Sequence, residues 1–344
     1  MRNLPAEWTT QSGIMLTWPH SKSDWQTSLD KIDTLYTLLT KVITQYEKVL
    51  ICCYDDDHIE HVTTLLNNAG INIQLQISFA ISPSNDSWTR DHGPISIFED
   101  KQPLLLDFQF NGWGNKYPAE LDNAITLNIY QQRKFGACKL IPSQLVLEGG
   151  SIDSDGEGTI LTTSQCLLSK QRNPNLSKQQ LTDELKNTLG VDRILWLDHG
   201  RLVGDDTDSH VDMLARFCNP STIAYTCCEQ DNDEHFHELK KMEKELQHFT
   251  QKNGAPYQLL PLPIPTAKFS IDGKRLPASY ANFLIINNAV LVPSYEDPAD
   301  EIAMQAIRKC FPDREVIGIP SLPLIQQYGS LHCASMQLPA GVLI

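Results

Sequence analysis

Cysteine chemistry is the first possibility that the residue types raise. Cys333 follows a Gly-Ser turn and stands next to a histidine, where other polar clusters of the chain could converge on it. A thiol becomes a strong nucleophile where a nearby base or charge favours the thiolate. We expect the other eight of the nine cysteines to be small buried side chains. The odd count and the lack of a C-x-x-C motif predict free thiols in a reducing compartment.

Clusters of carboxylates supply the second kind of candidate. Asp91 lies in a polar segment between apolar stretches, and Glu148 directly follows an apolar run and precedes two glycines. His210 and Asp212 lie where another apolar run begins, and alternation along a strand would direct both side chains to one face. A base and an acid buried side by side are costly unless they are paired or used, so we expect a site here.

This set of carboxylates around one cysteine favours a particular class of substrate. A cysteine protease needs an oxyanion hole of hydrogen-bond donors, whereas a cage of acceptors suits a planar cation with several donors. Guanidinium is such a group, because its fork of N–H donors matches paired carboxylates. Trp88 and Trp113 could add aromatic faces for the cation. Asp86 and Asp208 are further candidate contacts, although we interpret Asp86 more readily as a structural strut.

Composition excludes several other classes of protein. The formal net charge is −14, which repels nucleic acid phosphates, and 41 % of the residues are hydrophobic, as in a globular chain. The longest apolar runs, such as 283–286 and 289–292, are far shorter than the ~18 residues that a membrane helix needs. No basic and then apolar leader opens the sequence, so we expect a cytoplasmic protein without nucleic acid or membrane partners.

A repeated unit of strands and a helix would position these residues. Residues 49–54 form an apolar run, residues 58–69 have apolar positions at helical spacing, and residues 71–77 alternate as a strand does. Repetition of such units suggests a radial or stacked arrangement, although an ordinary α/β sandwich would show a similar pattern. Two later stretches each predict a hairpin, a helix and a returning strand. In the first, the hairpin is 211–217 with 221–227, the helix is 233–252 and the returning strand is 257–260. In the second, the hairpin is 283–286 with 289–292, the helix begins at 297 and the returning strand is 315–319.

Short motifs occur in a fixed order along the chain. The longest is Asn85-Asp86-Ser87-Trp88-Thr89-Arg90-Asp91-His92-Gly93-Pro94. The others are Pro5-Ala6-Glu7-Trp8, Trp18-Pro19-His20, Phe110-Asn111-Gly112-Trp113-Gly114, Leu147-Glu148-Gly149-Gly150, His210-Val211-Asp212, Ser279-Tyr280-Ala281-Asn282-Phe283 and His332-Cys333. Together they resemble, almost end to end, the agmatine deiminase and bacterial peptidyl-arginine deiminase family of guanidine-modifying enzymes. Each motif is weak singly, but the ordered set is specific.

The resemblance implies a fold and a reaction. The fold would be an α/β, pseudo-symmetric five-bladed propeller (a pentein) of strand-strand-helix-strand modules, in a single deiminase domain spanning residues 1–344. The reaction would hydrolyse a small-molecule guanidine, with agmatine giving N-carbamoylputrescine and ammonia as the favoured case. The resemblance also implies that no metal or cofactor takes part and that the enzyme is a homodimer.

The resemblance also implies a role for each candidate catalytic residue. Cys333 would attack the guanidinium carbon, while Asp91 and Asp212 would hold the guanidinium nitrogens. His210 would protonate the departing ammonia and then activate the water that hydrolyses the amidino thioether. Glu148 would pair with His210 or with the substrate. Because carboxylates surround the thiol, we expect a raised pKa for Cys333 in the free enzyme and easier ionisation once a cation binds.

The sequence departs from the family pattern beside the predicted site. Gln326-Gln327-Tyr328 replace glycines before the His-Cys pair, and Asp208 and Ser209 stand in a segment where glycine is common. These changes border the pocket, so arginine, a peptidyl arginine and other guanidines stay open as substrates.

Other classes of protein remain alternatives. An amidinotransferase would pass the amidino group to an amine instead of water, and a binding protein for cationic metabolites would not turn the ligand over. A metalloprotein could use His235 and His237, but side chains two positions apart on a helix face apart, so we expect both to be solvated. Residues 153–157 resemble a calcium loop only superficially, and we expect a hairpin turn there.

Overall fold

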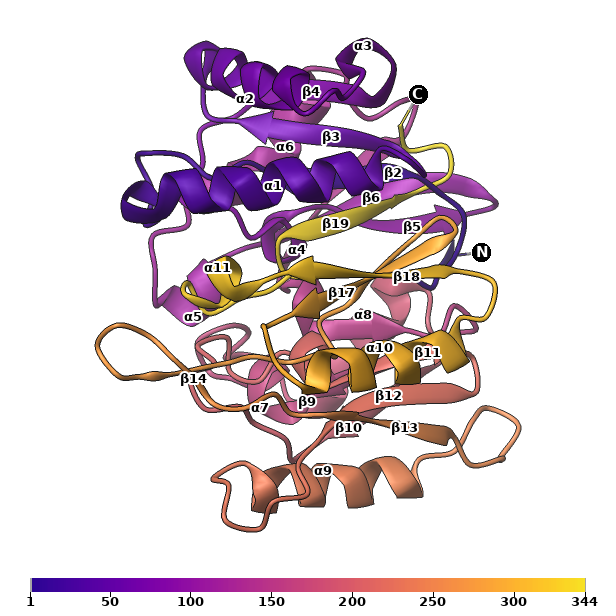
Figure 1. Ribbon diagram of the computed structural model, residues 1–344. Coiled ribbons are helices and arrows are strands. Elements are labelled where there is room, and N and C mark those ends of the chain that lie inside the picture. The colour runs from indigo at the N-terminus through magenta and orange to yellow at the C-terminus, as the bar shows by residue number, and fades with distance from the viewer. Residues whose placement is uncertain (1, 344) are drawn as a thin grey trace.

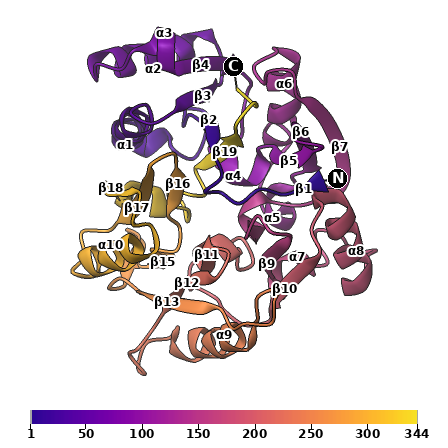
Figure 2. The ribbon, with the colours of Figure 1, turned by 90° about the vertical axis from the view of Figure 1, so that its right-hand side faces the viewer.

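The computed structural model describes residues 2–343, and one unit occurs five times in that range. In each unit two antiparallel strands are followed by a helix and by a further strand, which pairs parallel to the second strand. Figure 1 and Figure 2 show these sheets following one another around the molecule, with the longer helices at its periphery. The repeat predicted for a few stretches therefore extends along the described chain.

Four of the units are continuous in sequence. The first two are β5 (Ile95–Glu99), β6 (Gln102–Gln109), α6 (Ile125–Gln131) and β7 (Lys139–Val146), then β8 (Ile152–Ser154), β9 (Thr159–Thr163), α8 (Lys178–Leu189) and β10 (Arg193–Leu197). The next two are β11 (Ala215–Asn219), β12 (Thr222–Cys227), α9 (Phe236–His248) and β13 (Gln258–Pro263), then β16 (Leu284–Ile286), β17 (Ala289–Ser294), α10 (Ala299–Cys310) and β18 (Glu315–Pro320).

The fifth unit joins the two ends of the chain. Strand β19 (Ser335–Pro339) pairs antiparallel with β2 (Gln11–Thr17), which is followed by α1 (Leu29–Ile43) and β3 (Lys48–Cys53). Helices α2 (Asp56–Asn68) and α3 (Ile73–Gln76) lead to a fourth strand of this sheet, β4 (Ile77–Ile81), and β1 (Arg2–Asn3) pairs with the edge of β5. Glu7, which follows β1, and His332, which precedes β19, contact each other inside the molecule.

Local sequence signals explain several turns and helix ends. Asn288 turns the β16–β17 hairpin with a left-handed backbone (φ 60°), which asparagine tolerates. Helix α8 begins with a capping box between Ser177 and Gln180 and ends at the left-handed Gly190. Its buried face consists of Leu181, Leu185 and Leu189, which are four residues apart.

Two predicted elements have different bounds in the structure. The alternation over 71–77 predicts a strand, but residues 73–76 are helix α3, and the strand begins at Ile77. The side chain of Asn72 accepts a hydrogen bond from the N–H of Leu75, which is 72 % exposed, so this alternation does not mark a buried face. The helix predicted over 233–252 is α9, four residues shorter at its C-terminal end because Phe249 adopts extended backbone.

Short elements connect the units, and several of them carry predicted site residues. Within residues 2–343 no helix is long and apolar enough to cross a membrane. The short elements are η1 (Gln26–Ser28), α4 (Thr89–His92), α5 (Gly112–Asn115), η2 (Asp122–Ala124), η3 (Gly149–Ser151), α7 (Ser164–Leu167), η4 (Val211–Met213), β14 (Lys268–Phe269), β15 (Arg275–Leu276) and α11 (Leu322–Ile325).

Candidate active site

A cavity of about 80 Å³ brings together seven of the nine predicted site residues. Its walls contain Cys333, His210, Asp91, Asp212, Asp86, Trp88 and Trp113. Additional carboxylates and two tyrosines line it as well: Asp24, Asp205, Asp206, Tyr117 and Tyr328. The two remaining predicted residues, Glu148 and Asp208, lie outside its lining. The acidic groups in the lining are thus all aspartates, set among aromatic side chains.

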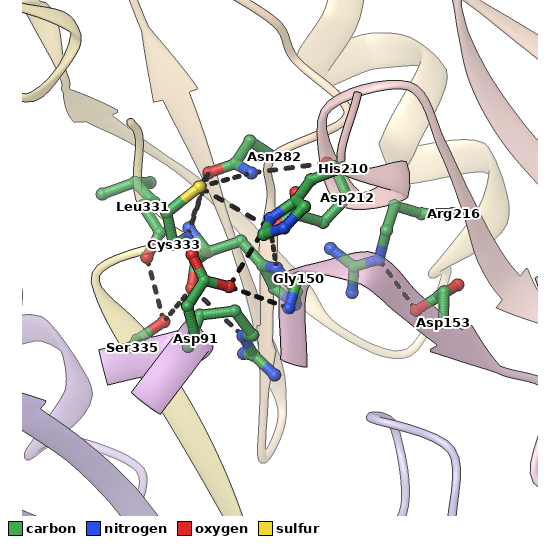
Figure 3. Close-up of polar contacts among 12 residues, drawn as sticks. Asp91, Gly150, Asp153, His210, Asp212, Arg216, Asn282, Leu331, Cys333 and Ser335 are labelled. Atoms are coloured by element: carbon green, nitrogen blue, oxygen red, sulfur yellow. Dashed lines mark hydrogen bonds and ion pairs between the residues drawn. The ribbon is translucent and has the colours of Figure 1, made fainter. Parts of the chain in front are cut away.

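The Cys333 thiol is buried in the turn that precedes β19, with 6 % of the residue exposed. Its Sγ lies 3.3 Å from Nδ2 of Asn282 and 3.6 Å from Oδ2 of Asp212 (Figure 3). Asn282 also fixes the backbone of this turn, because its Oδ1 accepts hydrogen bonds from the N–H groups of His332 (2.9 Å) and Cys333 (3.3 Å). The thiol is therefore held beside a carboxylate by a buried amide.

The surroundings of Cys333 disfavour its ionisation. Burial, Asp212 and Asp91 together raise the pKa of the thiol well above its ordinary value. This agrees in direction with the pKa expected from the sequence. A cation bound between the two carboxylates would oppose their effect and favour the thiolate.

Asp91 lies on the short helix α4, and both of its oxygens accept a hydrogen bond. Oδ1 accepts from the N–H of Gly150 (3.0 Å), and Oδ2 accepts from the indole N–H of Trp113 (2.9 Å). Trp113 reaches this position from α5, where residues 112–115 all have positive φ, with Trp113 itself at 55°. A Cβ atom added at Gly150 would lie 2.7 Å from Nδ1 of His210 and 2.8 Å from Oδ1 of Asp91, so a larger residue would disrupt this contact.

His210 and Asp212 do not lie in a strand. His210 precedes the 3-10 turn η4, which contains Asp212, and β11 begins only at Ala215. The expectation that strand alternation places them on one face is therefore wrong, because an apolar run does not distinguish a buried 3-10 turn from a strand. Oδ2 of Asp212 lies 2.8 Å from Nδ1 of His332, whereas Oδ1 has no hydrogen-bond partner among the described residues.

The ionisation states of the three central groups differ. Burial acts to lower the pKa of His210, but the charges around it, Asp91 first, outweigh burial and raise that pKa well above its ordinary value. Burial raises the pKa of Asp91 to about 6, against the opposing effect of His210. Burial also acts to raise the pKa of Asp212, but the hydrogen bond and charge of His332 lower it overall. The arrangement thus offers a protonated imidazole beside carboxylates, and such an imidazole can act as a general acid.

Glu148 and Asp208 form an ion-pair network just outside the cavity lining. Nε of Arg172 lies 2.9 Å from both oxygens of Glu148, and its Nη1 lies 2.7 Å from Oδ2 of Asp208. Lys116 contacts the other oxygen of Asp208 at 2.7 Å. Asp208 and Ser209 both have a left-handed backbone with φ of 67°, which gives a physical reason for glycine in this segment of the family pattern. In this structure Asp208 ties the loop before His210 to two cations.

One group in the described chain has the residue types and spacing of a metal site. Ligand atoms of Glu148, Cys166 and His210 lie within 4.8 Å of one another, and all three residues are buried. Zinc accepts nitrogen, sulfur and oxygen ligands of this kind. However, both oxygens of Glu148 already accept hydrogen bonds from Arg172, whose charge would repel a metal ion. We therefore interpret the group as support for His210.

Asp86 and Trp88 lie at the side of the cavity. Oδ1 of Asp86 accepts hydrogen bonds from the indole N–H of Trp25 (3.0 Å) and from the backbone N–H of Ser87 (2.7 Å). These bonds fit the structural role favoured for Asp86, although the side chain also lines the cavity. The ring of Trp88 packs against Gly329, where an added Cβ atom would collide with it.

Three residues that complete the site received no role from the sequence. Asn282 and Glu7 belong to motifs that mark the resemblance, and this membership is the signal that could have singled them out. Arg172 lies outside every motif considered, and only its contact with Glu148 identifies it. A buried ion pair between residues far apart in sequence has no local pattern.

The alternative metal site and calcium loop are explained differently by the structure. His235 is buried, so the expectation that it is solvated is wrong, whereas His237 is exposed. Nε2 of His235 accepts a hydrogen bond from the N–H of Val203 at 2.8 Å, which orders a loop. Residues 153–157 lie in the β8–β9 hairpin as expected, and Asp155 accepts backbone hydrogen bonds within it.

Comparison with known proteins gives consistent results. The sequence model of the Porphyromonas-type peptidyl-arginine deiminase family matches residues 3–339. Agmatine deiminase from Pseudomonas syringae pv. tomato is 30 % identical, over 98 % of this chain and 95 % of its own length. A solved structure from Porphyromonas gingivalis is 44 % identical, with a TM-score of 0.94 over 100 % of both chains. A cysteine-to-serine variant of C. jejuni agmatine deiminase, solved with substrate bound, is 39 % identical, with a TM-score of 0.91 over 99 % of this chain and 97 % of that one. The chain therefore belongs to the Porphyromonas-type peptidyl-arginine deiminase family.

Proposed function

We propose that this chain is a cysteine-dependent guanidine deiminase that converts agmatine and water to N-carbamoylputrescine and ammonia. The observation that carries the proposal is the position of Cys333 beside two buried carboxylates, one of which, Asp212, has an oxygen without a hydrogen-bond partner among the described residues. A buried carboxylate oxygen without a donor is costly unless a cation pairs with it. A guanidinium group supplies both the positive charge and the N–H donors.

In the first step the guanidinium would lie between Asp91 and Asp212, with its carbon within reach of Cys333. The bound cation favours loss of the thiol proton to solvent, and the thiolate forms a C–S bond to the guanidinium carbon. One C–N bond of the tetrahedral intermediate then breaks. His210, whose pKa is raised, donates the proton with which this nitrogen leaves as ammonia.

In the second step water hydrolyses the amidino thioether. The neutral His210 takes a proton from the water, which attacks the same carbon. The C–S bond breaks, the hydroxyl proton of the intermediate passes to the departing sulfur, and the ureido product is released with Cys333 again a thiol. Glu148, neutralised by Arg172, lies beside His210 and would keep the imidazole oriented through both steps.

The outer part of the cavity supports agmatine over arginine. Asp205, Asp206 and Asp24 line it with Tyr117, whose hydroxyl donates a hydrogen bond to Asp206 at 2.9 Å. Among the described residues, no lysine or arginine lines the cavity. An ammonium group at the distal end of the substrate would be attracted to these carboxylates, whereas the carboxylate of arginine would be repelled.

The proposal extends to the architecture and assembly of the chain. The five units would be the blades of one propeller-like domain spanning residues 1–344, which is supported by the pairing of β19 with β2 across the two ends. The enzyme would be a cytoplasmic homodimer. Light scattering during size-exclusion chromatography should give the mass of two chains, and the mass of one chain would overturn this part.

The decisive experiment measures ureido product and ammonia from agmatine, arginine and an arginyl peptide. The wild-type protein and Cys333→Ala are compared in the presence of a chelator. We expect turnover of agmatine, loss of turnover in the variant and no effect of the chelator. Turnover of the peptide alone would assign the chain to peptidyl-arginine chemistry, and binding without turnover in calorimetry would favour a binding protein.

A second measurement separates hydrolysis from amidino transfer. An added primary amine is supplied with agmatine, and the products are separated by mass. We expect the ureido product and ammonia in equal amounts regardless of the amine. A new guanidine derived from the added amine would identify an amidinotransferase instead.

A further inference from the structure

We propose that Glu7 and His332 are positioning residues, which hold Asp212 as a carboxylate so that it can bind the guanidinium group. The inference rests on the proposed function for its consequence in catalysis, but the arrangement itself is a property of the folded protein. Neither residue lines the cavity that contains Cys333. Both act through Asp212.

The imidazole of His332 bridges two carboxylates. Its Nδ1 lies 2.8 Å from Oδ2 of Asp212, and its Nε2 lies 2.8 Å from Oε2 of Glu7. An ionised carboxylate only accepts hydrogen bonds, so each ring nitrogen must donate one. Such a ring carries two protons and one positive charge. With both nitrogens donating, His332 would place a cation directly beside Asp212.

Glu7 is itself held by two hydrogen-bond donors in addition to His332, and a third group lies at ion-pair distance. Its Oε2 lies 2.6 Å from Nη2 of Arg216, and its Oε1 accepts a hydrogen bond from the N–H of Ile285 at 2.6 Å. Arg90 lies 3.9 Å from Oε2. Despite burial, which acts in the opposite direction, Arg216 and His332 lower the pKa of Glu7 far below its ordinary value. Glu7 is thus a permanent anion that can accept a hydrogen bond from Nε2 of His332.

A second cavity reaches these residues away from the thiol. Glu7, His332, Arg90 and Asp153 line it, whereas Cys333 and Asp212 line the first cavity. His332 and Cys333 are adjacent in sequence and yet belong to different cavities. The bridge from Glu7 through His332 to Asp212 therefore crosses the partition between them.

The need for this bridge follows from the charges that face Asp212. Asp91 lies on one side and opposes a further negative charge, while His210 and Arg216 favour it. On the other side, Arg216 and Arg90 face Glu7, and Asp153 pairs with Arg216 at 2.9 Å. Of the two carboxylates proposed to bind the guanidinium, only Asp212 has a hydrogen bond from a histidine of this kind, and only its pKa is lowered.

The first test measures ligand affinity against pH in an inactive background. Agmatine binding to Cys333→Ala is followed by calorimetry from pH 8 to pH 5 and compared with Cys333→Ala combined with His332→Gln. In the parent we expect only Asp91 to take up a proton, so affinity falls about tenfold per pH unit below its pKa. With His332→Gln a second carboxylate takes up a proton, and the loss between pH 8 and pH 5 should be at least tenfold larger. Identical pH curves would overturn the proposal.

A matched control separates this effect from the loss of any buried histidine. His235→Gln removes a histidine that is also buried and also contacts a carboxylate, Asp233 at 2.9 Å, but lies outside the cavity that contains Cys333. The pH curve of this variant should match that of the parent. Circular dichroism reports whether each variant is folded.

The second test needs neither a variant at His332 nor a substrate. Nitrogen NMR of the Cys333→Ala protein reports the protonation of the His332 ring, assigned from its backbone resonances. We expect both ring nitrogens to carry protons at pH 7. An unprotonated ring nitrogen at pH 7 would contradict the proposal. This measurement decides the inference even if agmatine does not bind, an outcome that would count against the proposed function alone.

Discussion

Two sets of buried carboxylates, Glu7 with Asp153 and Asp91 with Asp212, differ in their partners, and His332 contacts one member of each set, Glu7 and Asp212. Glu7 and Asp153 each contact Arg216, at 2.6 and 2.9 Å, so both have a permanent cationic partner. Asp91 and Asp212 have no arginine or lysine within ion-pair distance among the described residues. Their partners are histidines, an indole and a backbone amide. The same residue type is therefore structural on one side and available for a ligand on the other.

We call Asp91 and Asp212 the available set and Glu7 and Asp153 the permanently paired set. The difference between them indicates that the available set requires a cationic partner. Arg216 satisfies two carboxylates with the planar fork of its guanidinium group. The proposed substrate would bring a group of the same chemistry to Asp91 and Asp212. The protein thus contains, a short distance away, an internal example of the interaction that its ligand would complete. Each of the following predictions alters one side of this comparison.

The largest expected effect is on catalysis, from changes to the available set. Asp91→Asn and Asp212→Asn should each lower kcat/KM for agmatine by about 10³-fold, because each removes a charge that binds the cation and its transition state. The melting temperature should stay the same or rise in Asp91→Asn, whose charge is costly to bury, and should fall in Asp212→Asn, whose charge is paired with His332. Steady-state kinetics and calorimetry provide both values. A near-normal rate in either variant would remove that residue from the mechanism.

Loss of the cation that pairs with Glu7 and Asp153 should lower the stability of the fold. Arg216→Met leaves Glu7 and Asp153 without their cation, so the free energy of unfolding should fall by about 3–5 kcal/mol. Urea denaturation measures this change. Arg308→Met, which removes an exposed pair with Glu301, is the control and should cost less than about 1 kcal/mol. Equal losses in the two variants would contradict the assigned difference.

As the pH falls, Asp91 should take up a proton before the permanently paired carboxylates do. Burial holds the pKa of Asp91 at about 6, and only its ionised form attracts a cation, so kcat/KM should fall about tenfold per unit below that pH. Because this pKa is raised on folding, the contribution of Asp91 to stability is fully present below its unfolded pKa and is lost as pH rises through about 6. A pH–rate profile without a limb near pH 6 would show that Asp91 does not control binding.

Binding of a cationic ligand should increase the ionisation of the Cys333 thiol. The thiol is protonated in the free enzyme because burial and two carboxylates raise its pKa. A non-reactive guanidine should therefore increase thiolate absorbance by at most one thiolate per chain at neutral pH, and Cys333→Ala should show no change. Unchanged absorbance on binding would count against ligand-promoted ionisation.

The smallest expected effect concerns the outer carboxylates. Asp206→Asn removes one charge from the part of the cavity where a distal ammonium would lie, so the preference for agmatine over arginine should fall about tenfold. The ratio of the two kcat/KM values measures it. Asp198→Asn, an exposed surface carboxylate outside the cavity, serves as the control and should leave the ratio unchanged.

The sequence predicts the residues proposed to contact the ligand far better than the arginines that support them. Asp91 and Cys333 stand out because polar residues interrupt apolar runs there. Arg172 and Arg216 do not stand out, because their roles come from partners 24 and 63 or more positions away. The strand expected at His210 is a 3-10 turn for a related reason, since local hydrophobicity reports burial but not backbone geometry.

The contact between Glu7 and His332 spans 325 positions of the chain, which has a consequence for synthesis. At translation rates of about 5–20 residues per second, Glu7 is added to the chain roughly 15 to 65 s before His332 is. During that interval Arg216 is available to Glu7 earlier than His332 is, so the structural pair can form first. The nucleophile and the histidine that supports its site are added only after every other residue that lines the cavity, so a nascent chain cannot react with a guanidine until residue 333 has been added.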